Sequence, residues 1–521
     1  MTAAATDRAP AAPRPLEGST LALASIALAI GTFMQVLDAT IANVSIPTIA
    51  GDLGVAVDQG TWVITGFAVA NGISVPLTGW LMQRFGVVRT FVGSVALFTL
   101  MSLLCGLAWN LESLVLFRIL QGAVSGPMIP GSQALLIMIF GRQKQATALA
   151  IWSMTTLVAP ICGPILGGYI SDNFSWPWIF LINVPVGIAC CLICWTLLQA
   201  RETPTRKLPV DTIGFSMLVV WVGALQIMLD TGKDADWFSS PAIVIEALVS
   251  GVAFIAWLIW EMNDKHPIVD LSLFRSRNFA LGTLTFCLGY ASFFGINLLM
   301  PLWLQTQMGY PATWAGLTAA PSGVVAVFLT PFIARLISRV DARWIATMSL
   351  AAFGLSFWMR GQYGPDADFR ELVMPVLVMG VGMSGFFISM VTICLNGVPA
   401  DQVPQASGLT NFARITAGSF AASLVTTWWA NSEAVHQTRL AEIAGSRGDP
   451  VWTQTLRALQ EHGASTKQAA AVLGNQVGHQ AVFLATMDIF TVAGWVTASL
   501  IVLVWLTRPA RSQGGHAAAS E

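Results

Sequence analysis

Asp38 is a charged residue inside a long apolar run, where it stands between Gln35 and Thr40. A charged side chain at the centre of a membrane helix costs about 2.5–3.5 kcal/mol on insertion scales, so it marks a functional site by default. Burial disfavours the charged form of a carboxyl group, which can then take up and release a proton near neutral pH. The segment therefore predicts a proton-coupling residue at Asp38, with a permanently paired structural aspartate as the alternative.

Arg118 is a second charge in an apolar run, and a stripe of polar and small side chains follows it. Residues three or four positions apart share one side of a helix. On that side lie Gln121, Gly122, Ser125 and Ser132. With Gln35, this stripe is a candidate substrate path. The run of Asp38 leads outward and the run of Arg118 inward, so we expect both residues in the outer half of the membrane. Contact between them, which would tie proton release to helix movement, is a hypothesis.

Two further charges fall in apolar runs. Asp488 is about seven residues from the outer edge of the last run, so proton coupling and a role facing water are both open. Arg414 lies near the inner edge of its run. A long cationic side chain in that place can extend to the membrane surface, and this is the interpretation we favour for Arg414.

Residues 163–168 (GPILGG) close the fifth apolar run. Glycines four residues apart, as at Gly163 and Gly167, let helices approach closely. Pro164 removes a backbone donor and bends its helix, and Gly168 adds to the glycine density. The motif predicts a pivot or seal at the outer gate, with plain tight packing as the alternative.

Residues 79–89 (GWLMQRFGVVR) join the second and third apolar runs, and residues 331–343 weakly repeat them later in the chain. The candidate motif residues of the first loop are Gly79, Arg84, Gly86 and Arg89. A basic turn at the same place in two six-helix blocks suggests an internal duplication, which many secondary transporters have.

Membrane helices must position these residues, because the composition excludes a soluble protein. Of 521 residues, 55% are hydrophobic and 10% are charged, whereas soluble domains carry about 25% charge. The 26 basic and 27 acidic residues nearly cancel, so no net field attracts nucleic acid. All seven cysteines lie in apolar runs and do not indicate a disulfide framework.

Fourteen apolar runs approach the roughly 20 residues that a membrane helix needs. They begin near Leu21, Thr61, Thr90, Leu111, Ala146, Trp178, Asp211, Pro241, Phe279, Trp314, Arg343, Leu372, Ser407 and Ala481. Backbone groups in lipid must be satisfied within the segment, so we expect an all-α integral membrane protein of fourteen helices.

The basic residues predict that both termini are cytoplasmic. With the N-terminus inside, 17 Lys and Arg fall in cytoplasmic segments, and the short outer loops hold only Lys233, Arg360 and Arg370. Polar breaks divide the spans as six, two and six. The predicted parts are a tail at 1–20, a six-helix bundle at 21–198, two inserted helices with linkers at 199–278, a second six-helix bundle at 279–506 and a tail at 507–521.

One outer segment, residues 431–480, is long. Asp449 followed by Pro450 is typical of a helix start. The apolar residues that then share one face are Trp452, Leu456 and Leu459. Ser465 and Gln468 have the spacing of a capping box. We expect a short helical hairpin above the outer surface, which is either a lid or a docking site for another protein.

The sequence contains no motif for ATP hydrolysis or for binding a metal or cofactor. No histidine lies deep in an apolar run, no spacing of residues indicates a metal site, and no phosphate-binding loop of the Walker type is present. An ATP-driven pump, a metal centre and any other bound cofactor are therefore not expected.

Several motifs resemble those of major facilitator drug:proton antiporters with fourteen spans. They are residues 35–47 (QVLDATIANVSIP), the 79–89 loop, Arg118-x-x-Gln121-Gly122 and residues 159–168 (APICGPILGG). Three more segments resemble EmrB-type multidrug exporters of Gram-negative inner membranes. They are residues 61–80, 236–240 and 267–279. The resemblance runs from about Leu16 to about Arg508.

This resemblance implies the major facilitator fold and proton-driven export of lipophilic drugs, hydrophobic weak acids included, by alternating access. It implies proton coupling at Asp38 and Arg118, a gate at residues 163–168, two helices inserted between the halves, and no cofactor beyond the proton gradient. It also implies an inner-membrane location and two partners, an EmrA-type periplasmic adaptor and a TolC-type outer-membrane channel. An adaptor favours the docking interpretation of residues 431–480.

Two residues depart from the family pattern. Gln83 replaces the usual acid of the 79–89 loop, which puts a conformation-locking salt bridge from that position in doubt. Ala159 replaces a glycine before the antiporter motif and is still small enough for close packing.

Three other functions compete with drug export. Export of one endogenous metabolite or siderophore is the alternative within transport. A membrane-embedded enzyme would need polar catalytic clusters at the bilayer surface, and the sequence has none. A scaffold without transport would have no reason to retain Asp38 and the polar stripe after Arg118.

Overall fold

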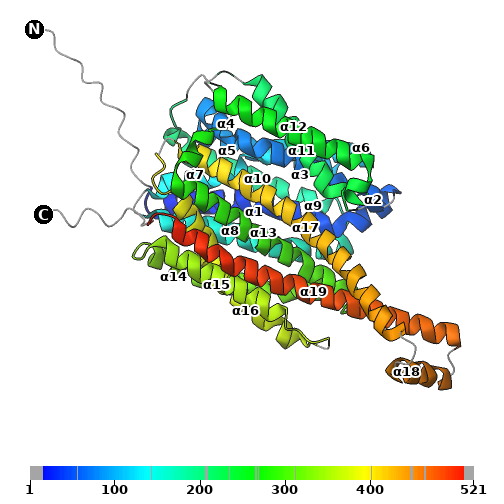
Figure 1. The fold of residues 1–521 in the computed structure, drawn as a ribbon. Coiled ribbons are helices and arrows are strands. Elements are labelled where there is room, and N and C mark those ends of the chain that lie inside the picture. Colours follow the sequence, from blue (N-terminus) through cyan, green and yellow to red (C-terminus); the bar gives the residue numbers. More distant parts are fainter. Residues whose placement is uncertain are drawn as a thin grey trace, which may run out of the picture.

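The computed structural model describes residues 16–509, apart from 56, 61, 142–143, 206–208, 210, 234, 265–266, 268, 311, 366, 400–401, 446–449 and 463–464. Within these residues the chain forms α-helices and short 3-10 helices and no β-strand. The helices run side by side in one elongated bundle (Figure 1).

Among the described residues, the first part of the bundle contains ten α-helices and two 3-10 helices. They are α1 (Gly18–Leu53), α2 (Val57–Gly60), α3 (Trp62–Ser74), η1 (Val75–Leu77), α4 (Thr78–Phe85), α5 (Val87–Gly106), α6 (Leu111–Ser125), α7 (Met128–Phe140), α8 (Gln145–Asn173), α9 (Trp178–Leu181), α10 (Asn183–Leu198) and η3 (Gln199–Arg201). Two longer helices follow, with a 3-10 helix between them. They are α11 (Thr212–Thr231), η4 (Trp237–Ser239) and α12 (Pro241–Asn263).

The last part of the bundle follows a further 3-10 helix. Its elements are η5 (Leu271–Arg275), α13 (Arg277–Thr306), α14 (Ala312–Ile337), α15 (Ala342–Arg360), α16 (Phe369–Cys394), α17 (Val403–Gly445), α18 (Pro450–Glu461) and α19 (Thr466–Leu506).

In the described part of the chain, eleven helices are long and apolar enough to cross a membrane. Thirteen of the fourteen predicted starts lie within four residues of an observed helix start. The exception is the last one, predicted near Ala481, because α19 begins at Thr466, before its apolar part. The helices are consistent with fourteen spans, and that count stays a prediction.

Local sequence sets the ends of the helices that carry the site. Asn110 caps α6 by accepting from the backbone amide of Ser113 at 2.9 Å, and the Ser113 hydroxyl completes a capping box. Gly86 separates α4 from α5 with φ at +94°, a conformation that favours glycine. Pro127, just ahead of α7, follows the end of α6.

The predicted outer segment is built mainly from the extended ends of two long helices. Figure 1 shows α17 and α19 running past the other helices, with α18 beside their ends. Helix α18 begins at Pro450 as predicted, whereas Asp449 and the side chain of Trp452 lie outside the described residues. Leu456 and Leu459 are partly buried. The predicted capping box at the start of α19 is present.

The first and last parts of the chain contact each other through a few helices. Helix α8 packs against α14, and α17 packs against α4 and α7. The inserted helix α11 contacts both α3 and α17. These contacts agree with two halves and an inserted pair, although the division at 21–198, 199–278 and 279–506 stays a prediction.

Candidate functional site

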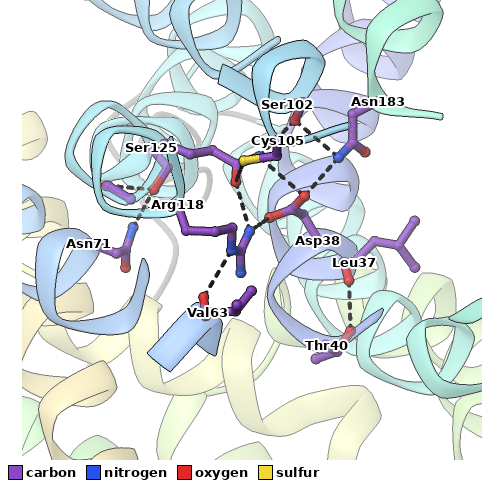
Figure 2. Close-up of polar contacts among 12 residues, drawn as sticks. Leu37, Asp38, Thr40, Val63, Asn71, Ser102, Cys105, Arg118, Ser125 and Asn183 are labelled. Atoms are coloured by element: carbon purple, nitrogen blue, oxygen red, sulfur yellow. Dashed lines mark hydrogen bonds and ion pairs between the residues drawn. The ribbon is translucent and has the colours of Figure 1, made fainter. Parts of the chain in front are cut away.

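Asp38 on α1 and Arg118 on α6 touch in the interior of the protein. Nη1 of Arg118 donates to Oδ2 of Asp38 at 2.5 Å, and both side chains are fully buried. The contact that the sequence left as a hypothesis is therefore present (Figure 2).

Two amides hold the second oxygen of the carboxylate. Nε2 of Gln121 donates to Oδ1 of Asp38 at 3.2 Å, and Nδ2 of Asn183 donates to the same atom at 2.8 Å. Both amides also donate to Oγ of Ser102, at 2.7 and 3.3 Å. Helices α1, α5, α6 and α10 thus meet at one carboxyl group (Figure 2).

The guanidinium of Arg118 has further neighbours of both kinds. Its Nε donates to the carbonyl oxygen of Val63 at 3.1 Å, and Nη1 also donates to Gln121 at 2.7 Å. The ring centres of Phe67 and Phe180 lie 4.2 and 5.4 Å from its central carbon. These contacts fix the cation between α3, α6 and the carboxylate.

This arrangement can convert a protonation event into movement. Protonation of Asp38 would remove the negative charge that Arg118 faces in a region without exposed surface. Leaving one member of a buried ion pair without its partner typically costs about 3–5 kcal/mol. The four helices that supply the site therefore have a strong energetic reason to rearrange when the carboxyl group changes its charge.

Sequence reasoning missed Asn183 and Ser102. Asn183 is an amide in a strongly apolar helix, and polar residues in such helices commonly bond across helix interfaces. That signal could have identified Asn183. Ser102 has no comparable signal, because serines are common in membrane helices and most satisfy the backbone of their own helix.

The predicted polar stripe is divided among three places. Gln121 joins Asp38, whereas Ser125 accepts from Nδ2 of Asn71 at 2.7 Å. Ser132 lies on α7, beyond the break at Pro127, and accepts from Thr32. The side chain of Gln35 is buried, and its Oε1 has no hydrogen-bond partner in the described part of the protein.

The other two predicted intramembrane charges lie away from this site. Asp488 is 57% exposed and pairs with Nε2 of His436 at 2.8 Å, so it lies outside the buried pair, and both of its interpretations stay predictions. The snorkelling prediction for Arg414 is wrong, since the side chain is 4% exposed. Its Nη2 donates to Asn411 at 3.1 Å, and the ring centre of Tyr290 lies 4.5 Å away.

The prediction that Arg360 lies in an outer loop is also wrong. Arg360 is the last residue of α15, and its side chain is 1% exposed. The loop begins one residue later, and the side chain points back among α15 and α16, where it contacts Met379.

The glycine motif brings α8 against the helix of Asp38. Gly163 and Gly167 leave no room for a side chain. A Cβ atom added at Gly163 would collide with the hydroxyl of Thr40, and one added at Gly167 would lie 2.8 Å from the carbonyl oxygen of Ile41. A Cβ at Gly168 would meet nothing within 4 Å. The motif continues within α8, and the side chain of Pro164 lies outside the described residues.

The 79–89 loop contacts both the late helix α17 and the linker after α10. A Cβ at Gly79 would lie 3.0 Å from the Cα of Gln405, and one at Gly86 would collide with the carboxyl group of Glu202. Glu202 accepts from the backbone amides of Val88 and Arg89 at 3.0 and 2.8 Å. Sequence analysis did not identify this carboxylate on the loop.

Arg84 and Arg89 of the same loop take different places. The guanidinium of Arg84 lies 5.4 Å from the ring centre of Trp80. Arg89 holds Glu202 through its backbone amide rather than through its side chain. No group of metal-binding side chains was found among the described residues.

Comparisons with known proteins agree on a family. The Major Facilitator Superfamily matches residues 28–422. The chain is 46% identical over 496 residues to the "Multidrug export protein EmrB" of Haemophilus influenzae, covering 95% of this chain and 97% of that protein. It is 45% identical over 503 residues to the EmrB protein of Escherichia coli, covering 96% and 98%.

A solved structure supports the fold alone. The crystal structure of a peptide transporter, POT, matches with a TM-score of 0.57 at 13% identity and covers 95% of this chain and 98% of the other. With eleven helices able to cross a membrane among the described residues, the protein is a multi-pass membrane protein. The chain belongs to the Major Facilitator Superfamily, as an EmrB-type secondary transporter and not an enzyme.

Proposed function

We propose that this protein exports lipophilic drugs and other toxic compounds across the inner membrane, driven by the proton gradient and without a cofactor. The observation that carries the proposal is the buried pair of Asp38 and Arg118, 2.5 Å apart, with two amides on the second carboxylate oxygen. The relatives of this chain that are named multidrug export proteins support the class of cargo.

In this proposal Asp38 carries the proton. Uptake of a proton removes the charge that Gln121 and Asn183 donate to, and it leaves Arg118 without its counter-ion. Helices α1, α5, α6 and α10 then change their packing, and release of the proton restores the pair. Each cycle of the two halves thereby includes protonation and deprotonation of the site.

The close approach of α8 to α1 transmits this change. Gly163 and Gly167 face Thr40 and Ile41, which follow Asp38 within one helical turn. Movement of α1 therefore moves α8, which also packs against α14 of the other half. We propose that this contact is the pivot or seal of the outer gate.

The contact between the 79–89 loop and α17 acts as the inner closure. Gly79 admits the backbone of Gln405 because it has no side chain. Glu202 supplies a carboxylate to the N-terminus of α5, where backbone amides and the helix dipole favour negative charge. Glu202 thus supplies a carboxylate to this loop, whereas position 83, the place of the usual acid, holds Gln83.

We place both termini in the cytoplasm and the extension at residues 431–480 in the periplasm. The extension is long, helical and rich in exposed side chains, which supports docking to an EmrA-type adaptor that leads to a TolC-type channel. The six-two-six division of the spans completes the proposed architecture.

Export of one endogenous metabolite or siderophore is the second candidate. The buried pair would serve either cargo equally, so the discrimination is experimental. A drug-susceptibility panel in cells with and without the adaptor separates the two. Broad, adaptor-dependent protection supports drug export, and protection against no drug supports a single metabolite.

Replacement of Asp38 by asparagine tests the coupling. Asp38→Asn keeps the size of the side chain but removes its proton exchange, so we expect pH-gradient-driven efflux from proteoliposomes to be lost while the protein folds. Asp488→Asn is the matched control, because Asp488 lies outside the buried pair and is 57% exposed. Undiminished uphill efflux by the Asp38 variant would refute the proposed coupling.

A further inference from the structure

A second buried polar cluster lies in the last part of the chain, between α13, α15 and α16. Nη2 of Arg360 lies 3.2 Å from Sδ of Met379, and Nδ2 of Asn297 lies 3.6 Å from the same sulfur. The three side chains come from three different helices, and two of them converge on the thioether of the third. A thioether is only a weak hydrogen-bond acceptor, so Nη2 of Arg360 points at a poor partner, whereas Nδ2 of Asn297 also donates to the carbonyl oxygen of Phe293 at 2.7 Å.

The cluster has more donors than acceptors. Nε and Nη1 of Arg360 have no hydrogen-bond partner, and neither has Nε1 of Trp303, which is fully buried nearby. The Trp303 ring stacks on Tyr363, with ring centres 6.1 Å apart, and Tyr363 follows Arg360 by three residues. The hydroxyl of Tyr363 is used, since it donates to the carbonyl oxygen of Leu372 at 3.0 Å.

Arg360 has no counter-ion in the described part of the protein, since no acidic side chain there lies within 4.0 Å of it. An arginine side chain stays protonated in proteins, and a buried charge without a partner is strongly disfavoured. The remaining neighbours are apolar or neutral, such as Phe357 and Met379. The cluster is therefore complete only with a negatively charged group.

The first helix of each half contributes a polar side chain to its cluster. This side chain is an acid in the first part of the chain and an amide in the last part. There the first, third and fourth long helices supply Asp38, Ser102 and Arg118. In the last part the first, third and fourth helices supply Asn297, Arg360 and Met379. A cation is present in both clusters, but the second has an amide where the first has its carboxylate.

One member of the second cluster reaches the surface of the protein. Asn297 is partly exposed, whereas Arg360 and Met379 are buried. An anion that passes Asn297 would meet the two unpaired nitrogens of Arg360. Because the cation is tightly buried, the site selects a small anionic group. This group is either a free anion or the acid group of a molecule with an apolar body.

We propose that Arg360 and Asn297 form an anion-binding site, which takes either the acid group of a lipophilic cargo or free chloride. The cargo arm rests on the export function proposed above, whereas the binding itself does not. Arg360 supplies the charge and two free donors, and Asn297 supplies an amide at the entrance.

The test is equilibrium binding to the purified full-length protein in nanodiscs without a pH gradient. The probes are pyrenebutyrate and its uncharged amide, which share one apolar body. Losing hydrogen bonds to a charged group weakens binding at least about tenfold. We expect Arg360→Gln and Asn297→Leu to weaken the acid by at least that factor and to leave the amide unchanged. The matched control is Arg335→Gln, an exposed arginine on α14.

A second measurement identifies the source of the anion. Thermal unfolding is followed in chloride and in gluconate, with and without pyrenebutyrate. Stabilisation by chloride that Arg360→Gln abolishes assigns the site to chloride, and stabilisation by pyrenebutyrate alone assigns it to cargo. Equal effects of Arg360→Gln on the acid and the amide, or no anion effect that depends on Arg360, would overturn the proposal.

Two further variants guard against misfolding of Arg360→Gln and separate the anion site from proton coupling. If Arg360→Gln fails to fold, Asn297→Leu leaves Arg360 in place and still must weaken the acid. Asp38→Asn alone must lose gradient-driven efflux, and Arg360→Gln added to Asp38→Asn must still weaken the acid and not the amide. Failure of proton coupling and failure of the anion site are thus seen in different variants.

Discussion

The first and last parts of the chain differ in whether their buried charges are paired. In the first part, Asp38 and Arg118 neutralise each other with both side chains fully buried. In the last part, Arg360 and Arg414 are buried at 1% and 4% exposure, and neither forms an ion pair with a described acidic residue. In the first arrangement the cation has a counter-ion, whereas in the second neither cation has one among the described residues.

This difference indicates a division of labour. A buried ion pair is held together until a proton neutralises its carboxylate, so it suits a site that responds to protonation. A buried cation with free donors depends on a partner from outside, so it suits a site that binds one. In an exporter that couples protons to cargo, separate sites let the proton and the cargo act on different helices.

The largest effect is expected from removing the cation of the complete pair. Arg118→Met leaves the carboxylate of Asp38 buried with only Gln121 and Asn183 as donors. We expect a loss of about 3–5 kcal/mol in unfolding free energy, the typical cost of breaking a buried pair, and loss of efflux. Chemical unfolding in detergent measures the first quantity.

The double variant Asp38→Asn with Arg118→Met controls this experiment. Without either charge the site holds no unpaired ion, so the double variant should regain a large part of the stability and still lack coupled efflux. If Arg118→Met is as stable as the unmodified protein, the pair does not hold these helices together, and the contrast between the two ends of the chain fails.

Much of the first site is predictable from the sequence. Asp38 and Arg118 stand out because ionised residues are rare in apolar runs, and the run order places them at the same depth. The helix starts follow from apolar length and from caps such as Asn110. These signals are local, and each is visible in fewer than twenty residues.

Arg360 and Arg414 escaped prediction for a physical reason. Both stand near the end of a predicted span, where an arginine normally reaches water. Their burial depends on neighbours from other helices, Met379 for the one and Tyr290 for the other. Only packing between helices decides this, and the sequence does not show it. The same holds for Ser102, which joins the Asp38 site across a helix interface.

A middle-sized effect should come from the glycines that let the first and fifth helices of each half meet. In the first half, a Cβ at Gly167 would meet the backbone oxygen of Ile41 at 2.8 Å. In the second half, the atoms nearest to a Cβ at Gly418 would all belong to side chains, with that of Tyr290 nearest at 3.0 Å, and a side chain can turn aside. Overpacking typically costs about 1–3 kcal/mol.

We therefore expect Gly167→Ala to lose stability in that range and to slow efflux, and Gly418→Ala to lose less. Gly168→Ala is the control on the same helix, because a Cβ there meets nothing within 4 Å. Thermal unfolding and proteoliposome efflux measure both effects. Equal losses at Gly167 and Gly168 would show that the approach of α8 to α1 is not what limits the protein.

The smallest effect is expected from an exposed ion pair. Asp488 and His436 lie 2.8 Å apart between α19 and α17, with exposures of 57% and 19%. Exposed pairs contribute about 0–1 kcal/mol, because water already stabilises the separated charges. Asp488→Asn should therefore change the unfolding free energy by less than about 1 kcal/mol and leave efflux nearly intact. A loss as large as that of Arg118→Met would mean that burial does not set the value of a charge pair in this protein, and that Asp488 shares the work of Asp38.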